Sequence, residues 1–158
     1  MASVAEALYN TLLVANNVEI SGNAAASSGG GVWMNHANTR LNMSGGEISD
    51  NGFMELFDAN NVLIGTVQTV NGGGVYVANG RFDLHNGAVS DNWARNGGGV
   101  GVGTNGHFHT RSNQALPGTA EISGNEVLGI LDSTSNGNGG ACSSRRVRQP
   151  MSALAAAQ

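Results

Sequence analysis

Hydrophobic and polar residues alternate along this chain in short runs, without the spacing of an amphipathic helix. Residues 72–96 show this most clearly, in the runs Val75-Tyr76-Val77, Phe82-Asp83-Leu84 and Ala88-Val89-Ser90. A period of two is typical of a strand that buries one face. The Asn-Gly pairs that separate the runs are turn signals. This stretch therefore predicts three short strands joined by tight turns, each directing its apolar residues to the same side.

Two motifs alternate along the chain at a unit of roughly 25 residues. Gly-Gly-Gly-Val occupies residues 29–32, 72–75 and 97–100, and a degenerate copy follows at Gly139-Gly140-Ala141. Ile/Val-Ser-x-Asn lies between these copies, at residues 20–23, 48–51, 89–92 and 122–125. Such a repeat indicates a solenoid, in which each copy buries its apolar face against the next.

Aligning the repeats places apolar residues at equivalent positions. The strands of successive copies share Val32, Val75 and Val100; Met34, Val77 and Val102; Leu41, Phe82 and Phe108; Met43 and Leu84; and Ile48, Val89 and Ile122. An incomplete first copy has Leu13 seven residues before Ile20, the spacing that separates Leu41 from Ile48. We expect these side chains to line one interior. The chain would then form about four rungs, in a stack about 20 Å tall.

The repeated asparagines and glycines have structural roles in this arrangement. Four asparagines fall at the same corner of successive rungs, where stacked amides can bond one another and the turn backbone: Asn23, Asn51, Asn92 and Asn125. The glycine triplets permit backbone conformations closed to other residues and a close approach of neighbouring rungs. A helix is a poor alternative, because a glycine triplet would cost it about 3 kcal/mol. The sequence thus predicts an all-β fold.

Composition narrows the classes of function. The net charge is −4 and only 11% of residues are charged, so no basic surface is available for nucleic acid. The cluster at residues 145–148 is interpreted as part of a solvated terminus. No apolar run is long enough to insert into a membrane, and Met1–Ala15 lacks the basic start and long apolar stretch of a secretory signal. Cys142 is the single cysteine, which excludes a disulfide within the chain.

The combination of Gly-Gly-Gly-Val with Gly-x-Ile/Val-Ser-x-Asn, over about residues 12–142, resembles the right-handed parallel β-helix repeats of large bacterial surface and secreted proteins. It is similar to the repeats of chlamydial polymorphic outer-membrane proteins and of autotransporter passengers. The resemblance implies a pectate-lyase-like fold, located outside the cell or at its surface. Many proteins with such repeats are adhesins or stalks, and others that share the fold are pectate lyases or polygalacturonases.

The catalytic motifs of those enzymes are absent from this chain. There is no Asn-Thr-Asp, Asp-Asp or Gly-His-Gly set of the polygalacturonase kind, and no calcium-binding aspartate cluster with an arginine of the pectate-lyase kind. Asp50 and Asp91 could pair as the carboxylates of a glycosidase do. Gly22 and Gly124 fill the same slot in other repeats, however, which favours a role in a turn. An enzymatic role is therefore the less favoured one, and no cofactor is expected.

The ends of a solenoid expose unpaired strand edges and need a cap. Ala2–Ala15 is rich in alanine and leucine, and we expect an amphipathic helix that covers the first rung. In the alternative, Leu12–Ala15 is already strand. The capped β-helix would span residues 1–142, and residues 143–158 would form a tail that is disordered or loosely docked.

Three segments exceed the short rung, at residues 52–71, 110–119 and 126–138. The longest is too apolar for a solvated loop, because it carries Phe53, Met54, Leu56, Phe57, Val62, Leu63 and Ile64. It either packs back on the flank of the solenoid or forms a partner-binding surface. Trp93 and Arg95 lie at the same edge and are candidates for that surface.

Outward positions form columns along the stack, with equivalent residues about 5 Å apart. Trp33 and Tyr76 are neighbours in one column, either as a pair that stabilises the sheet or as a platform for a sugar or another protein. Two further columns contain Arg40, Arg81 and His107, and Asn42, Asp83 and His109. His107, His109 and Asp83 could together hold a metal ion, but alternating surface charges are far commoner, so no metal site is expected.

These observations favour a non-catalytic structural or adhesive module of an extracellular bacterial protein. Its partner would be a second copy, joined end to end, or another surface protein. In the alternative, the chain is a carbohydrate-binding module or a degenerate polysaccharide lyase or glycoside hydrolase. It would then contact polysaccharide through Trp33, Tyr76, Trp93 and Arg95, with residues 52–71 as one wall of a cleft.

Overall fold

The structure of the chain is a computed structural model that describes residues 5–6, 11–14, 17–110 and 119–127. Its elements are β1 (Ala5–Glu6), β2 (Thr11–Val14), β3 (Glu19–Ser21), β4 (Val32–Ser49), β5 (Phe53–Phe57), β6 (Leu63–Gln68), β7 (Val75–Ser90), β8 (Trp93–Ala94), β9 (Val100–Thr110), β10 (Ala120–Ser123) and β11 (Glu126–Val127). Within the described ranges there is no helix, and hence none of the length and apolarity needed to cross a membrane. The prediction of an all-β chain is confirmed for these residues.

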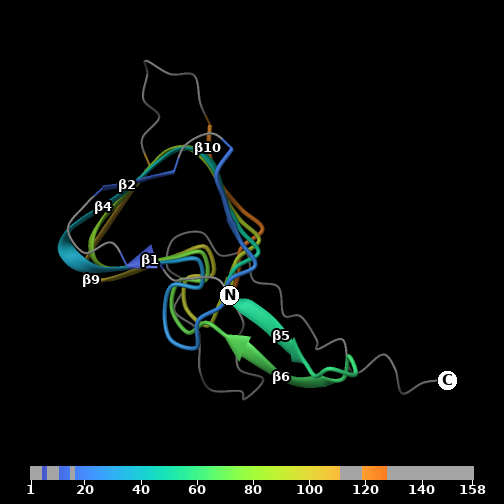
Figure 1. The fold of residues 1–158 in the computed structure, drawn as a ribbon. Coiled ribbons are helices and arrows are strands. Elements are labelled where there is room, and N and C mark those ends of the chain that lie inside the picture. The colour runs from blue at the N-terminus through green and yellow to red at the C-terminus, as the bar shows by residue number, and fades with distance from the viewer. Residues whose placement is uncertain (1–4, 7–10, 15–16, 111–118, 128–158) are drawn as a thin grey trace.

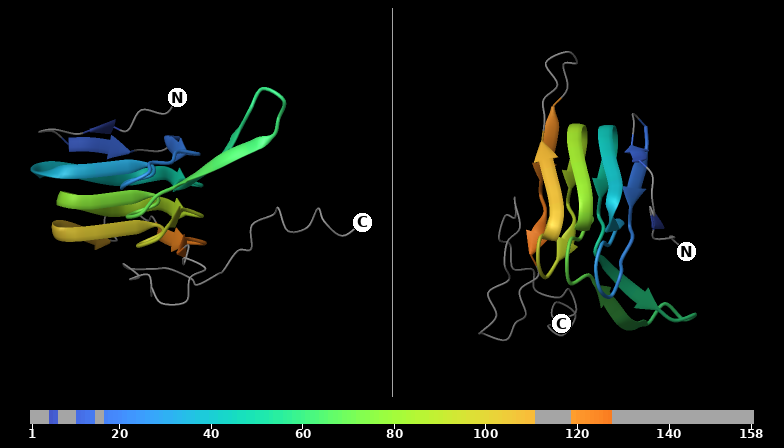
Figure 2. Two further views of the ribbon diagram at one scale, coloured as in Figure 1. Left: turned by 90° about the horizontal axis from the view of Figure 1, so that it is seen from below. Right: turned by 90° about the vertical axis from the view of Figure 1, so that its left-hand side faces the viewer.

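Most of the strands are parallel, and the long ones bend around the molecule. β4 pairs with β7, and β7 pairs with β9 and β10. The strands follow a roughly triangular outline in Figure 1, and in Figure 2 they lie side by side as successive layers. Register shifts interrupt the β4–β7 ladder at its bends, between Met34 and Arg40 and between Met43 and Glu47. β4 and β7 thus each contain the three predicted runs, joined by bulges, whereas the third run of the last repeat is the separate strand β10.

Residues that the repeats predict to be equivalent are Cα partners in these ladders. The partners are Val32, Val75 and Val100; Met34, Val77 and Val102; Leu41, Phe82 and Phe108; Met43 and Leu84; and Ile48, Val89 and Ile122. A register slip of one residue would turn every side chain of a strand to the opposite face. The match therefore explains how all these positions come to share one side of the sheet.

One predicted alignment is wrong by a single residue. Leu12, and not Leu13, lies opposite Leu41, although Ile20 still pairs with Ile48. The segment between these positions is one residue longer in the first copy than in the second, and Asn17 occupies it with a φ of 68°. The extra residue allows Val14 to lie opposite Met43 and to be buried in the core.

The predicted N-terminal helix is wrong wherever that segment is described. β1 and β2 are strands, and both pair in parallel with β4. The edge of β4 carries a row of backbone N–H and C=O groups, which a parallel strand can pair with and a helix cannot. Thr11 and Val14 are also β-branched, which suits a strand. The alternative, that Leu12–Ala15 is already strand, is confirmed for residues 12–14.

The interior consists of the repeated apolar residues. The buried cluster contains Val14, Val32, Met34, Leu41, Met43, Ile48, Val75, Val77, Phe82, Leu84, Val89 and Val100, and Ile20, Phe108 and Ile122 pack against it. The rings of Phe82 and Phe108 lie 5.0 Å apart between centroids. Val102, in the last long strand, is 44% exposed although its partner Val77 is fully buried. The core is therefore less covered at this end.

Residues 53–68 leave the parallel layers as an antiparallel hairpin. β5 and β6 form a two-stranded sheet of their own, from the pair Phe53–Gln68 to the pair Phe57–Leu63. The Asp58 carboxylate closes the turn by accepting hydrogen bonds of 2.8 Å from the backbone N–H groups of Asn60 and Val62. Figures 1 and 2 show the hairpin projecting away from the layered strands.

Several predictions concern segments outside the described residues. They include most of the insertions at residues 110–119 and 126–138, the degenerate motif at 139–141, Cys142 and the tail at 143–158.

Candidate functional site

Four asparagines, one from each Ile/Val-Ser-x-Asn motif, form a hydrogen-bonded ladder along one corner. Asn51 donates to Asn92 Oδ1 from its side-chain Nδ2, at 2.9 Å, and from its backbone N, at 3.0 Å. The same two bonds join Asn23 to Asn51 and Asn92 to Asn125. The second hydrogen of each inner amide goes to a backbone carbonyl, as from Asn92 Nδ2 to Ile48 O at 2.8 Å.

The ladder is a structural device. Asn51, Asn92 and Asn125 are buried, so water cannot replace their partners. Each amide satisfies backbone groups at a corner where the strands end, as buried polar groups require. The structure brings all four asparagines together, and their side-chain amides are engaged with the protein itself.

The glycine triplets and the asparagines occur together because they pack against each other. The first glycine has a positive φ, as at Gly72 with 62°. A Cβ on the second glycine, Gly73, would collide with the backbone of Trp93 and Gly98. A Cβ on the third, Gly74, would lie 2.9 Å from the amide carbon of Asn92. A side chain is therefore disfavoured at each of the three positions, for a different steric reason at each.

A second polar ladder was not predicted from the sequence. It joins the residues that precede the glycine triplets: Asn96 Nδ2 donates to Asn71 Oδ1 at 3.0 Å, and Asn71 Nδ2 donates to Ser28 Oγ at 3.3 Å. The signal was available, because a serine or an asparagine stands before each of the three intact triplets.

Asp50 and Asp91 lie in bends at equivalent corners of adjacent repeats. Both have a positive φ, of 53° and 54°, and so do Gly22 and Gly124 at the equivalent positions. Aspartate and glycine are among the residues that tolerate this left-handed conformation. The interpretation of these residues as turn residues is confirmed.

The base of the hairpin is anchored on the parallel layers. The rings of Phe53 and Trp93 stack with centroids 5.7 Å apart and planes inclined at 29°. Trp93 belongs to β8, which pairs with β11 in a small parallel sheet. Arg95 follows on the same corner with an exposed side chain, and its backbone N donates to Thr69 O at 3.0 Å. Of the candidates at this edge, the structure thus joins Phe53 and Trp93 directly.

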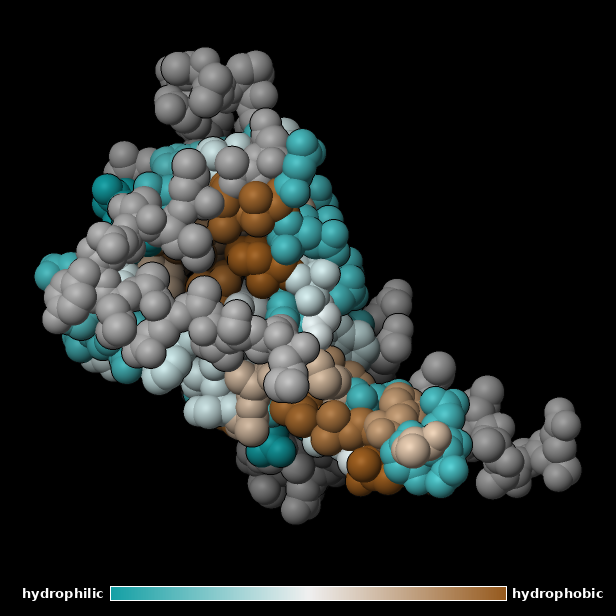
Figure 3. All heavy atoms as spheres, in the orientation of Figure 1, coloured by the Kyte–Doolittle hydropathy of each residue, from teal (hydrophilic) through white to brown (hydrophobic). Residues whose placement is uncertain are grey.

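The far end of the hairpin exposes apolar side chains. Phe57 is 50% exposed and Ile64 is 65% exposed, and Leu56, Val62 and Leu63 are exposed as well. Figure 3 shows apolar side chains along this projecting arm. The prediction that the insertion packs back on the flank holds for its base and is wrong for this tip. We call Leu56, Phe57, Val62, Leu63 and Ile64 the hairpin tip.

Trp33 and Tyr76 are Cα partners in β4 and β7 and lie on the outer face, as predicted. Both are half-buried. The Tyr76 ring lies over Gly101 of the next strand, where a Cβ would be 2.9 Å from the ring. This packing fits a pair that stabilises the sheet.

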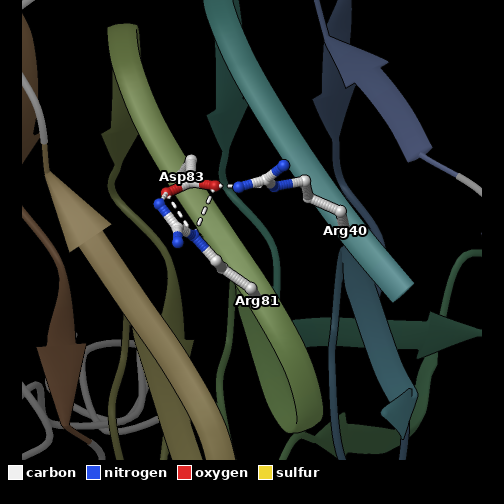
Figure 4. Close-up of polar contacts among 3 residues, drawn as sticks. All are labelled: Arg40, Arg81 and Asp83. Carbon is white, nitrogen blue, oxygen red and sulfur yellow. Dashed lines mark hydrogen bonds and ion pairs between the residues drawn. The ribbon is translucent and has the colours of Figure 1, made fainter. Parts of the chain in front are cut away.

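Asp83 joins two arginines on the outer face of the second runs. Arg40 Nε donates to Asp83 Oδ2 at 3.0 Å, and Arg81 Nε donates to both carboxylate oxygens at 2.7 Å (Figure 4). Arg81 Nη2 also lies 2.5 Å from Oδ1. Asp83 is only 1% exposed, whereas the side chains of Arg40 and Arg81 are 48% and 31% exposed. The sequence predicts an outward position for Asp83 but not this burial beneath two arginines.

Electrostatics at this cluster favour the charged carboxylate. Burial by itself would raise the pKa of Asp83. The hydrogen bonds and positive charges of Arg81 and Arg40 outweigh burial and hold the pKa of that carboxyl below its ordinary value. The hydrogen bond from Arg81 to Asp83 raises the pKa of the guanidinium in turn. The shifts of Asp83 and Arg81 thus both favour the charged pair.

A metal site is not assembled from His107, His109 and Asp83. The register places His107 beside Arg81 and His109 beside Asp83. The Asp83 carboxylate is taken up by the two arginines, and no group of three metal-ligating side chains occurs in the part of the chain that the structure describes.

An open groove runs across the third runs of the strands. It is lined by Glu19, Glu47 and Glu121, with glycine and small residues between them. Glu19 and Glu47 accept hydrogen bonds from the hydroxyls of Ser21 and Ser90. Neither serine is among the residues that line the groove.

Comparison with family models, with curated proteins and with solved structures found no match for this chain. The candidate site therefore stands on its geometry: an anchored hairpin with an exposed apolar tip, and an arginine pair held by a buried aspartate. The hairpin tip presents apolar side chains to solvent, and the arginine pair presents partly exposed guanidinium groups.

Proposed function

We propose that this chain is a short right-handed parallel β-helix that acts as a non-catalytic scaffold. Its role is structural or adhesive: it holds the β5–β6 hairpin away from a stiff body and associates through that hairpin. The resemblance of the repeats to those of bacterial surface proteins supports an extracellular location. We infer binding and not turnover, because the polar side chains of the corners are used up in holding the strands together.

Two features support the β-helix. Equivalent positions of successive repeats are Cα partners across parallel ladders, and each repeat passes through three runs separated by bends. The asparagine ladder runs along one corner through all four repeats, as stacked rungs require. In such a fold each rung supplies hydrogen bonds to the next, so the body is rigid along its axis.

The single observation that carries the binding role is the contrast between the two ends of the hairpin. Its base is fixed by the stacking of Phe53 on Trp93, while its tip leaves five large apolar side chains exposed. Exposed apolar clusters on monomers commonly mark interaction sites. An anchored arm also loses less conformational freedom on binding than a loose loop does.

A second copy of the chain is the partner that the hairpin fits best. β5 and β6 pair only with each other among the described residues, so both outer edges of the hairpin are open. A two-stranded hairpin is marginal alone, and pairing with another hairpin makes a four-stranded sheet. Glu55 is the one charged side chain within β5 and β6, and the Asp58 carboxylate lies beyond them in the turn. Two copies can therefore meet with little charge repulsion.

Light scattering coupled to gel filtration tests this association. We expect the molar mass of the wild type to rise from monomer to dimer with concentration, and the double variant Phe57→Ser/Ile64→Ser to remain monomeric. Both residues are at least half exposed, so the variant should keep its fold, which circular dichroism checks.

Val102→Ser is the matched control, because it removes an exposed apolar residue at the end of the stack instead of the hairpin. We expect it to dimerise like the wild type. If Val102→Ser stays monomeric while the hairpin variant still dimerises, the hairpin is not the site of association and end-to-end joining is favoured. A wild type that stays monomeric at every concentration would overturn self-association.

The alternative proposal, a carbohydrate-binding module or degenerate lyase or hydrolase, is tested by a glycan array with the Trp33→Ala/Tyr76→Ala variant. Under our proposal the two proteins give the same signals. A signal for neutral glycans that disappears in the variant would favour the alternative, as would turnover of polygalacturonate.

A further inference from the structure

The arginine pair on the outer face carries a second inference, which goes beyond the proposed scaffold role. Arg40 of β4 and Arg81 of β7 are Cα partners on adjacent strands, and their guanidinium groups both turn toward the carboxylate of Asp83 (Figure 4). Two like charges so close would repel each other without that carboxylate. The buried Asp83 therefore fixes the position of both cations.

The two arginines keep unused hydrogen-bond donors. Arg40 contacts Asp83 through Nε alone, so its two terminal nitrogens have no acceptor among the described residues. Arg81 uses Nε and Nη2 and leaves Nη1 free in the same sense. Both side chains are partly exposed, so these donors are accessible from solvent. A planar guanidinium with free N–H groups is suited to an oxyanion.

The neighbouring outward positions add basic and neutral polar groups, and no further acid. His107 and His109 of β9 lie beside Arg81 and Asp83, and Asn42 of β4 lies on the other side of Asp83. The local charge of Arg40, Arg81 and Asp83 is +1, from two cations and one anion, while the whole chain carries −4. This face is thus a basic site on an acidic protein.

We propose that Arg40 and Arg81 form an oxyanion site for the carboxylate or sulfate group of an acidic glycan, with Asp83 as the positioning residue. A glycan offers one oxyanion together with several hydroxyls, which matches two fixed guanidinium groups flanked by amide and imidazole side chains. Nucleic acids and anionic membranes bind through many cations at once, and this face has two permanent ones.

Fluorescence anisotropy with a fluorescein-labelled alginate oligosaccharide, whose sugars are uronates, tests the site at low ionic strength. We expect saturable binding that sulfate ions compete away and that rising salt weakens. Arg40→Gln and Arg81→Gln should each weaken binding about tenfold, as expected for a lost charge-assisted hydrogen bond. Arg95→Gln makes the same change of charge at the hairpin edge and should bind like the wild type.

Two further variants keep the proposal open to refutation if a glutamine variant unfolds. Arg40→Lys keeps a cation beside Asp83 but loses the planar fork, and we expect weaker binding. Asp83→Asn raises the local charge to +2 yet releases the arginines, and we again expect weaker binding. Tighter binding by Asp83→Asn would show simple charge attraction and would overturn the positioned pair.

The same binding assay with other ligands tests whether the site selects an acidic glycan. Equal binding of the neutral maltohexaose would overturn the oxyanion site. Tighter binding of single-stranded DNA, or of phosphatidylserine vesicles, than of the uronate would overturn the glycan as its ligand. Loss of binding in Arg95→Gln equal to that in Arg40→Gln would also count against the site.

Discussion

At the scale of single residues, a few buried polar side chains determine how the strands meet. Each ladder asparagine supplies the donors and acceptors that a corner leaves unpaired, and Asp83 does the same for two arginines on the outer face. Removing a partner from a buried polar group costs more than the net value of the bond, because the remaining group stays dry and unpaired. These positions should therefore be sensitive to substitution.

Asn92→Ala tests the ladder. The change removes four hydrogen bonds, to Asn51, Ile48 and Asn125, at a fully buried site. We expect a loss of about 3–5 kcal/mol in the free energy of unfolding, measured by urea denaturation. Asn23→Ala, at the partly exposed start of the ladder, should cost about 1 kcal/mol. Equal losses would show that burial does not set the cost.

The lowered pKa of Asp83 predicts that the folded chain loses stability in acid. Asp83 has a lower pKa in the folded chain than in the unfolded chain, so its charged form stabilises the fold above the unfolded pKa. That contribution is lost as the pH falls through the folded pKa. The difference in Tm between wild type and Asp83→Asn should therefore shrink when the pH falls from 5 to 2, as thermal melts would show. A difference in Tm that stays constant over this pH range would contradict the role of the Asp83 charge.

At the scale of elements, the chain contains two kinds of strand with different support. The parallel strands share a continuous core and two polar ladders, whereas β5 and β6, among the described residues, pair with each other and are joined to the body through the contact of Phe53 with Trp93. Local stability follows the number of buried contacts, so the hairpin should open more readily than the body.

Phe53→Ala tests the anchor. The loss of an aromatic pair is worth about 1 kcal/mol beyond the buried area. We expect hydrogen exchange of the β5–β6 amides to accelerate about tenfold, with the amides of β4 and β7 unchanged. Phe57→Ala makes the same chemical change at the exposed tip and should have a smaller effect. Faster exchange throughout the chain would show instead that the hairpin unfolds together with the body.

At the scale of the whole molecule, the repeat makes the fold modular. Each layer contacts the layer before and the layer after it, and equivalent residues meet in register. If the fold is the proposed β-helix, stability is close to a sum over layers, and one whole layer can be removed without changing the others.

Deletion of residues 75–99 tests this modularity. It joins Gly74 to Val100, so that Val100 takes the place of Val75 and Asn125 that of Asn92 in the ladder. We expect a folded, less stable protein with an unchanged β-type circular dichroism spectrum per residue. Deletion of residues 75–86 removes only part of the repeat and should unfold the chain, because the register is lost. If neither variant folds, the repeat is not modular.

Much of the fold was predictable because, in a repeat, each residue is expected to lie beside its equivalents in the copies before and after it. The spacing of Val75, Phe82 and Val89 already identifies the residues that lie above and below them, and the two motifs indicate the corner where Asn51 and Asn92 stack. Alternation and glycine spacing are local properties of the sequence. The strands, most of their register and the turn roles of Asp50 and Asp91 follow from them.

Features that the repeat pattern does not specify were decided by tertiary contacts. β1 and β2 are strands because the edge of β4 offers them backbone partners, and the register of Leu12 depends on one extra residue before Ile20. The hairpin that stacks on Trp93 belongs to an insertion that the other repeats lack. The burial of Asp83 depends on two arginines at equivalent positions turning toward one carboxylate, which alternation alone does not specify. The sequence by itself thus determined the layers, because identical neighbours repeat the same contacts, and only the three-dimensional arrangement decided the proposed binding surfaces.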